Sequence, residues 1–137
     1  MSEVFSSLAY GFSVALTPIN LMYATLGSII GTLIGVLPGI GPVSGIAILI
    51  PVTYGMNPAS AMILLTAMYY GTMYGGSTTS ILVNVPGEAS SVVTTLDGYQ
   101  MARQGRGGAA LAIAAIGSFV AGTLSIVFLM LFAVPVI

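Results

Sequence analysis

The sequence contains very little charge, with two basic and three acidic residues among 137, or 4%. A water-soluble domain carries charge on about a quarter of its residues, so this scarcity excludes an ordinary globular protein. Two arginines cannot form a surface that binds nucleic acid phosphates. With 57% hydrophobic residues and a mean hydropathy of +1.09, the sequence predicts a protein dissolved in the lipid bilayer.

Cysteine and histidine are absent, which excludes disulfides, thiolate metal sites and imidazole chemistry. Ser77 and Ser80 have no His or Lys that could activate them as nucleophiles. The Gly75–Thr79 run resembles a phosphate-binding loop but lacks its lysine. We therefore predict no enzyme, no catalytic residue, no metal site and no cofactor, with Na⁺ as the candidate coupling ion.

Glycine and proline divide the apolar chain into segments. The residue spacing predicts a mildly amphipathic helix from Ser2 to Ala15, and then a spanning helix that begins at Thr17-Pro18 and reaches Leu37. Val43–Tyr54 is too short for the ~30 Å hydrocarbon core, and Pro51 interrupts it. A further helix opens at Asn57-Pro58, because Asn is a favoured N-cap, and is expected to end near Tyr74.

Gly108–Val134 is uncharged and long enough to span the bilayer at a tilt. Its first half is rich in small residues and is expected to face protein, whereas Ile126–Phe132 is bulky and is expected to face lipid. The predicted fold class is therefore all-α, a polytopic integral membrane helical bundle with Gly/Pro-broken, discontinuous or re-entrant helices. We interpret residues 1–137 as one membrane domain, and the end at Pro135-Val136-Ile137 as truncation of a larger permease.

Gly27, Gly31, Gly35 and Gly39 recur every fourth residue and form a groove on one helix face. Membrane helices approach one another closely along such grooves, so packing is the expected role. The Pro38–Pro42 break that follows has two interpretations. It is either a connecting turn or an unwound point between two half-helices, whose N–H groups would face an anion.

The stretch from Gly75 to Asn84 combines two glycines with the hydroxyls of Ser77, Thr78, Thr79 and Ser80. Because glycine costs a helix about 1 kcal/mol relative to alanine, we expect the backbone to unwind here. Unwound backbone at membrane depth lines a polar cavity or is buried in protein, and transporters place solute and ion sites there. The alternative is that the hydroxyls only satisfy backbone groups or join helices.

The Glu88–Gly107 segment contains four of the charged residues and is predicted to be a loop, with a turn or N-cap at Asp97-Gly98. Within it, Gly98–Gln104 could form one or two helical turns, with Gly105 just past their end. Arg103 and Arg106 predict a cytoplasmic position, because cytoplasmic loops are enriched in basic residues. The charges have two interpretations, a solvated loop or, for Glu88, a role in ion coupling.

Long strings of the sequence resemble one family, the large membrane subunit of tripartite tricarboxylate transporters (TctA type). The resemblance covers essentially the whole chain. The strings that carry it are Leu16-Thr17-Pro18, Gly35–Pro42, Tyr69–Glu88, Ser90–Val93 and Leu96–Arg106.

The resemblance implies a multi-pass permease of the bacterial inner membrane that works by citrate symport or uptake of related carboxylates. It also implies a small membrane subunit and a periplasmic solute-binding protein as partners, and an ion gradient as driving force. Together with the pattern above, it points to a substrate or ion site. The candidate residues are Gly39, Gly41, Gly75, Gly76, Ser77, Thr78, Thr79 and Asn84.

Two alternatives stay open at this point. The chain could be a non-transporting membrane fragment or helical scaffold, since family members are much longer. It could also belong to a permease for a different solute, because nothing in the sequence selects citrate over other carboxylates.

Overall fold

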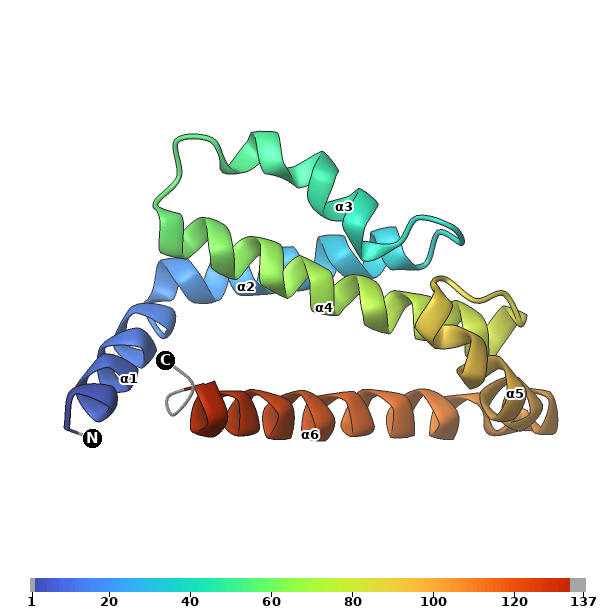
Figure 1. Ribbon diagram of the computed structural model, residues 1–137. Helices are drawn as coiled ribbons and strands as arrows, with labels where there is room; N and C mark the ends of the chain where they lie inside the picture. The colour runs from blue at the N-terminus through green and yellow to red at the C-terminus, as the bar shows by residue number, and fades with distance from the viewer. Residues whose placement is uncertain (1, 134–137) are drawn as a thin grey trace.

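A computed structural model of the chain describes residues 2–133. The structure is 87% helical, without a strand among the described residues, which confirms the all-α membrane bundle. Figure 1 shows the arrangement of the elements. The α-helices are α1 (Ser2–Ala15), α2 (Pro18–Gly35), α3 (Pro42–Leu49), α4 (Pro58–Val83), α5 (Val92–Met101) and α6 (Gly107–Ala133), and the shorter helical turns are η1 (Ile50–Thr53), η2 (Ala89–Ser91) and η3 (Ala102–Arg106).

Both predicted proline-led helix starts are confirmed. Asn57 is the N-cap of α4, and its Oδ1 accepts a hydrogen bond of 3.0 Å from Ala59 N–H. Thr17 is the N-cap of α2 with an extended backbone. Its hydroxyl does not cap the helix but donates to Val14 O at 2.8 Å, back into α1.

The α2 and α4 helices run side by side in the same direction, and α3 with η1 carries the chain back above them in the view of Figure 1. Since α3 and η1 have eight and four residues, together they rise only about 20 Å. Pro51 lies in η1, where it ends the α-helical pattern. The return segment is therefore short and broken, as predicted for Val43–Tyr54.

Few apolar side chains are buried within the described chain: Leu49, Leu64, Met68, Ile81 and Ala110. Large apolar residues are exposed along all the α-helices, far beyond the patches that a water-soluble monomer presents. Two helical stretches are long and apolar enough to cross a membrane, Pro18–Gly35 and a window within Ala89–Phe132. The chain is a membrane protein.

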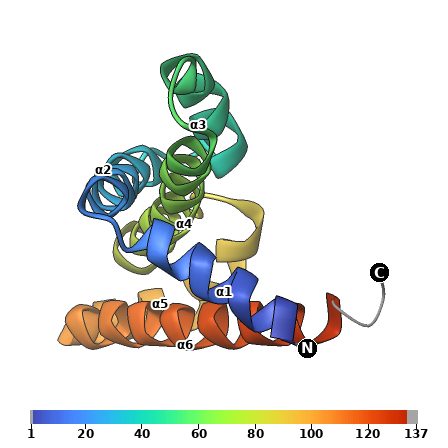
Figure 2. The ribbon, with the colours of Figure 1, turned by 90° about the vertical axis from the view of Figure 1, so that its left-hand side faces the viewer.

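The α6 helix runs back alongside α4, in the opposite direction (Figures 1 and 2). Its Ile126–Phe132 stretch is exposed, as expected for a lipid-facing surface. The expectation for its small residues is met at Ala110, which is buried, whereas Gly117 and Ala121 are exposed within the described chain. The predicted helix end at Val134, and Pro135–Ile137, lie outside the described residues.

The prediction of a loop over Glu88–Gly107 is wrong, because most of this segment is helical and packs against α4 and α6. The predicted turn or N-cap at Asp97-Gly98 is wrong as well, since both residues lie inside α5. Gly98 is needed for packing: a Cβ there would lie 2.7 Å from Ile81 Cγ1 of α4. Gly105, predicted to end a short helix, adopts a left-handed φ of 78° before α6.

Candidate functional site

The glycines of α2 bring its backbone against that of α4. A Cβ on Gly27, Gly31 or Gly35 would come within 3.0 Å of backbone atoms of α4. The predicted glycine groove is thus confirmed at these three positions, and its partner is α4. Gly39 does not belong to it, because α2 ends at Gly35 and Gly39 lies exposed in the following turn with φ +88°.

The α4 helix contributes its own glycines to the same contact. Gly71 packs on the backbone of Ser28 and Thr32, and Gly75 packs on that of Thr32 and Gly35. Glycines from both sides therefore make α2 and α4 one closely packed pair, as small residues do between membrane helices. This contact fixes the carboxyl end of α2 beside Gly75-Gly76.

The predicted unwinding at Gly75-Gly76 is wrong. The α4 helix continues through both glycines to Val83, and they are buried. Close packing against α2, which only glycine permits at position 75, offsets the helix cost of about 1 kcal/mol per glycine. The helix ends instead at Val83, and its C-cap Asn84 adopts a left-handed φ of 61° two residues before Pro86.

The hydroxyls that follow the two glycines all bond within their own helix. Each donates to a carbonyl three or four residues earlier in the continuous helix. The bonds run from Ser77 to Met73 O (3.2 Å), from Thr78 to Tyr74 O (3.0 Å), from Thr79 to Gly76 O (2.9 Å) and from Ser80 to Gly76 O (2.9 Å).

These bonds decide what the stretch can bind in this conformation. A hydroxyl that donates its hydrogen to a helix carbonyl keeps lone pairs on its oxygen. Those lone pairs suit a hard cation such as Na⁺, whereas a carboxylate needs donors. Carboxylate binding by Ser77 or Thr78, which are half-buried, would require their bonds to the helix to open.

The remaining predicted site residues lie in the turn after α2 or at the ends of helices. Gly41 is the N-cap of α3, and a Cβ on Gly41 or Gly39 would meet no heavy atom within 4 Å. The Pro38–Pro42 break is real, but these glycines do not pack on the α4 stretch. Asn84 is exposed at the carboxyl end of α4. Gly75, Gly76, Ser77, Thr78 and Thr79 share one helix, whereas Gly39 and Gly41 stand apart.

Sequence reasoning missed a junction of three glycines beside this stretch. Gly87 packs on Gly76 and on the carbonyl oxygen of Gly35: a Cβ at position 87 would overlap the Cα of Gly76 and lie 3.1 Å from Gly35 O. The next residue, Glu88, brings its carboxylate to Gly76: a Cβ there would lie 3.5 Å from Glu88 Oε1. Burial raises the pKa of the Glu88 carboxyl above its ordinary value, and a hydrogen bond with Ser90 partly offsets this.

A second feature missed from the sequence is a buried polar pair that joins three helices. Asn20 of α2 donates to Val14 O of α1 at 2.8 Å and accepts a 2.6 Å hydrogen bond from Ser60 of α4. Asn20 and Ser60 are both buried. The sequence did offer a signal for this pair, because Asn20 is a strongly polar side chain near the start of a predicted spanning helix.

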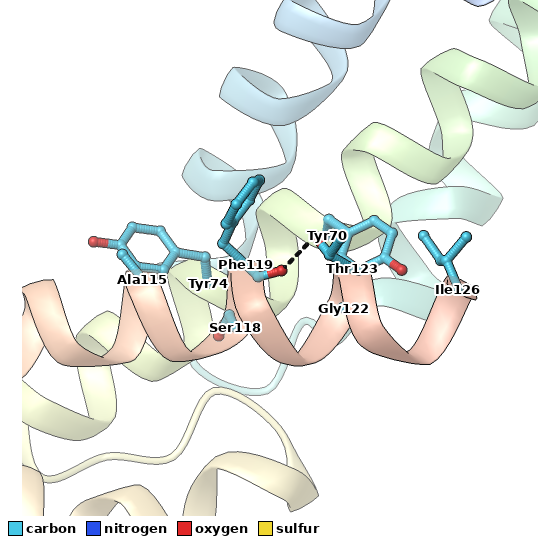
Figure 3. A pocket seen from close by; sticks show the side chains of 8 residues that line it. All are labelled: Tyr70, Tyr74, Ala115, Ser118, Phe119, Gly122, Thr123 and Ile126. Carbon is cyan, nitrogen blue, oxygen red and sulfur yellow. Dashed lines mark hydrogen bonds between the residues drawn. The ribbon is translucent and has the colours of Figure 1, made fainter. Parts of the chain in front are cut away.

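A cavity of about 400 Å³ lies between α4 and α6 (Figure 3). Tyr70 and Tyr74 line it from α4, and Phe119 and Thr123 are among the residues that line it from α6. The Thr123 hydroxyl donates to Phe119 O at 2.8 Å. None of the predicted site residues lines this mainly apolar cavity, so it is separate from the glycine junction.

Comparison with known proteins decides the family. Residues 21–137 match the model of the tripartite tricarboxylate transporter TctA family. The chain belongs to this family. The match contains the Pro38–Pro42 break, all of α4 and the glycine junction. The TctA family is one of transporters rather than of enzymes.

One curated relative of this TctA chain is an Agrobacterium vitis protein described as an uncharacterized 52.8 kDa protein in the TAR-I ttuC' 3' region. It is 53% identical over 135 residues, which make up 98% of this chain and 27% of that protein. The TctA chain thus spans about a quarter of the relative's length. No solved structure matches this chain.

Proposed function

We propose that this chain is part of the membrane permease of a tripartite, binding-protein-dependent secondary transporter. The permease takes up tricarboxylates such as citrate, or related carboxylates, across a bacterial inner membrane, and an ion gradient drives it. The observation that carries this proposal is the family match over residues 21–137. Its partners are a small membrane subunit and a periplasmic solute-binding protein, and Arg103 and Arg106 lie on the cytoplasmic side.

The fold supports this proposal through the arrangement of its helices. The glycine contact makes α2 and α4 one closely packed pair, whereas the short α3 and η1 segment beside it is interrupted at Pro51. Transporters combine such rigid pairs with broken segments, which change access to a site near the bilayer midplane. We propose alternating access of this kind, with the solute or ion held near Gly75–Thr79.

Uptake by the whole permease that contains this chain tests the function. Proteoliposomes would contain the permease and the small membrane subunit, with the binding protein and labelled citrate outside. We expect uptake of citrate that requires all three proteins and an imposed ion gradient. Other carboxylates should inhibit this uptake in the order of their affinity. If the permease takes up none of a panel of di- and tricarboxylates, the proposal is refuted. If it takes up another class of solute, it is a different permease.

The site is tested by the double replacement Ser77→Ala and Thr78→Ala. Loss of their oxygens should abolish uptake while the permease still inserts into the membrane. Thr25→Ala is the matched control, because the Thr25 hydroxyl also donates to a carbonyl of its own helix, Leu21 O at 2.8 Å, but lies exposed on α2. Unchanged uptake by the double variant would remove Ser77 and Thr78 from the site.

A further inference from the structure

Glu88 is the first charged residue after Glu3 in the sequence, and the fold brings it to the α2–α4 contact. Its carboxylate lies beside Gly76: a Cβ built there would be 3.5 Å from Oε1 and 3.7 Å from Cδ. Because glycine has no side chain, the carboxylate lies beside the backbone of α4 at position 76, where a Cβ would make ordinary van der Waals contact with it.

The backbone around Glu88 is fixed from both sides. Before it, Gly87 packs on Gly76 and on the carbonyl oxygen of Gly35. After it, the Ser91 hydroxyl accepts from Glu88 N–H at 3.2 Å and donates to Glu88 O at 2.9 Å. Ser91 is itself buried. The position of the carboxylate is thus set by the fold and not by a basic partner.

Among the described residues, no basic group pairs with this carboxylate: it is partly buried, and it accepts hydrogen bonds from the Ser90 side chain and from the Ser91 backbone N–H. The neighbouring elements carry these titratable groups: Tyr69, Tyr70 and Tyr74 on α4, Asp97 and Tyr99 on α5, and Arg103 and Arg106 on η3. The carboxyl half of α2 has no titratable group. A partly desolvated carboxylate without a basic partner favours binding of a cation.

The residues that form this junction, and those next to them on α4, carry further oxygen atoms. The carbonyl of Gly35 lies at the same junction, near the carboxyl end of α2, where the helix dipole attracts positive charge. On α4, the hydroxyls of Thr79 and Ser80 surround the carbonyl of Gly76 and keep their lone pairs. Oxygen ligands of this kind suit a proton or Na⁺.

We propose that the Glu88 carboxylate, at the junction of Gly35, Gly76 and Gly87, binds the monovalent cation that drives transport. This inference rests on the proposed function and assigns its coupling step to one residue. Protonation of the carboxylate and coordination of Na⁺ are two sources of the same positive charge, and the experiment distinguishes them.

The test is uptake by the whole permease in proteoliposomes, with a pH gradient at fixed Na⁺ in one arm and a Na⁺ gradient at fixed pH in the other. The arm that drives the wild type identifies the cation. Glu88→Gln should lose accumulation in that arm, whereas Glu88→Asp, which keeps a shorter carboxylate, should retain it at a weaker apparent cation affinity. Asp97→Asn is the matched control, because it removes the same charge from an exposed residue of α5 and should accumulate as the wild type does.

A binding measurement covers the case in which Glu88→Gln inserts poorly. For the purified wild type, the thermal midpoint should depend on the same cation. If that cation is the proton, the contribution of Glu88 to stability is present at low pH and lost as pH rises through its raised pKa. Glu88→Asp should keep the cation dependence and Glu88→Gln should lose it.

Two results would overturn the inference in distinguishable ways. If the wild type accumulates carboxylate and Glu88→Gln does so equally, with the same cation dependence, the cation binds elsewhere and the proposed function still stands. If the wild type accumulates no carboxylate in either arm, the proposed function fails and the inference fails with it.

Discussion

The glycine contact between α2 and α4 leads to a prediction with a definite sign. At Gly31 a Cβ would come within 3.0 Å of the Met68 carbonyl oxygen, carbonyl carbon and Cα at once. These are backbone atoms, which cannot rotate away as a side chain would. Gly31→Ala must therefore push the two helices apart.

The magnitude follows from two opposing effects. Replacing glycine with alanine inside a helix gains about 0.5–1 kcal/mol. Forcing a methyl group into a closely packed contact costs about 1–3 kcal/mol, and the three backbone overlaps at Gly31 favour the upper part of that range. We expect a net loss of about 1–2 kcal/mol.

The assay is the thermal midpoint of the detergent-solubilised permease, followed by size-exclusion chromatography after heating. Gly117→Ala is the control, because a Cβ at Gly117 of α6 meets no heavy atom within 4 Å in the described chain. It should leave the midpoint unchanged or raise it, whereas Gly31→Ala should lower it. A Gly31→Ala protein as stable as the wild type would refute the backbone-to-backbone contact.

Three further predictions use the same thermal assay. Asn20→Ala leaves the buried Ser60 hydroxyl without its acceptor and should cost about 1–3 kcal/mol; no change would show that the pair is dispensable. Asn57→Ala removes the α4 cap and should cost about 1 kcal/mol, so an equal midpoint would contradict the capping role. Asn84→Gly should be tolerated at its left-handed φ, whereas Asn84→Val should cost at least ~1 kcal/mol, and equal midpoints for these two would contradict that geometry.

Proline and charge were reliable guides to the fold. Pro18 and Pro58 each mark a helix start, because proline lacks the N–H that the first helical turn leaves unbonded anyway. The scarcity of charge predicted the membrane environment. The position of Pro51 likewise predicted the short, broken return segment.

Glycine was the unreliable guide, because its effect depends on a partner that local sequence does not reveal. The Gly75-Gly76 pair suggested unwinding, yet Gly75 is where α2 reaches the α4 backbone. Gly98 suggested a turn, yet it makes room for Ile81. In both cases tertiary packing outweighed helix propensity, which is only a weak local preference.

The candidate site was predicted in part. The sequence pointed to the hydroxyl-rich segment of α4, and the structure shows those hydroxyls bonded within the helix. The approach of Glu88 to Gly76 joins residues twelve positions apart across a helix end. Neither periodicity nor motif spacing predicts it, because it depends on the path of the chain after Asn84.

The most direct test of the account is whether substrate protects position 77. Since this chain contains no cysteine, Ser77→Cys introduces a single reporter thiol into it, with any cysteine elsewhere in the permease replaced. A carboxylate that the permease transports, added with the coupling cation, should slow modification of this thiol by a hydrophilic maleimide, and should leave the rate at Thr25→Cys unchanged. Equal rates at Ser77→Cys with and without saturating substrate and cation would contradict a solute or ion site at this segment of α4.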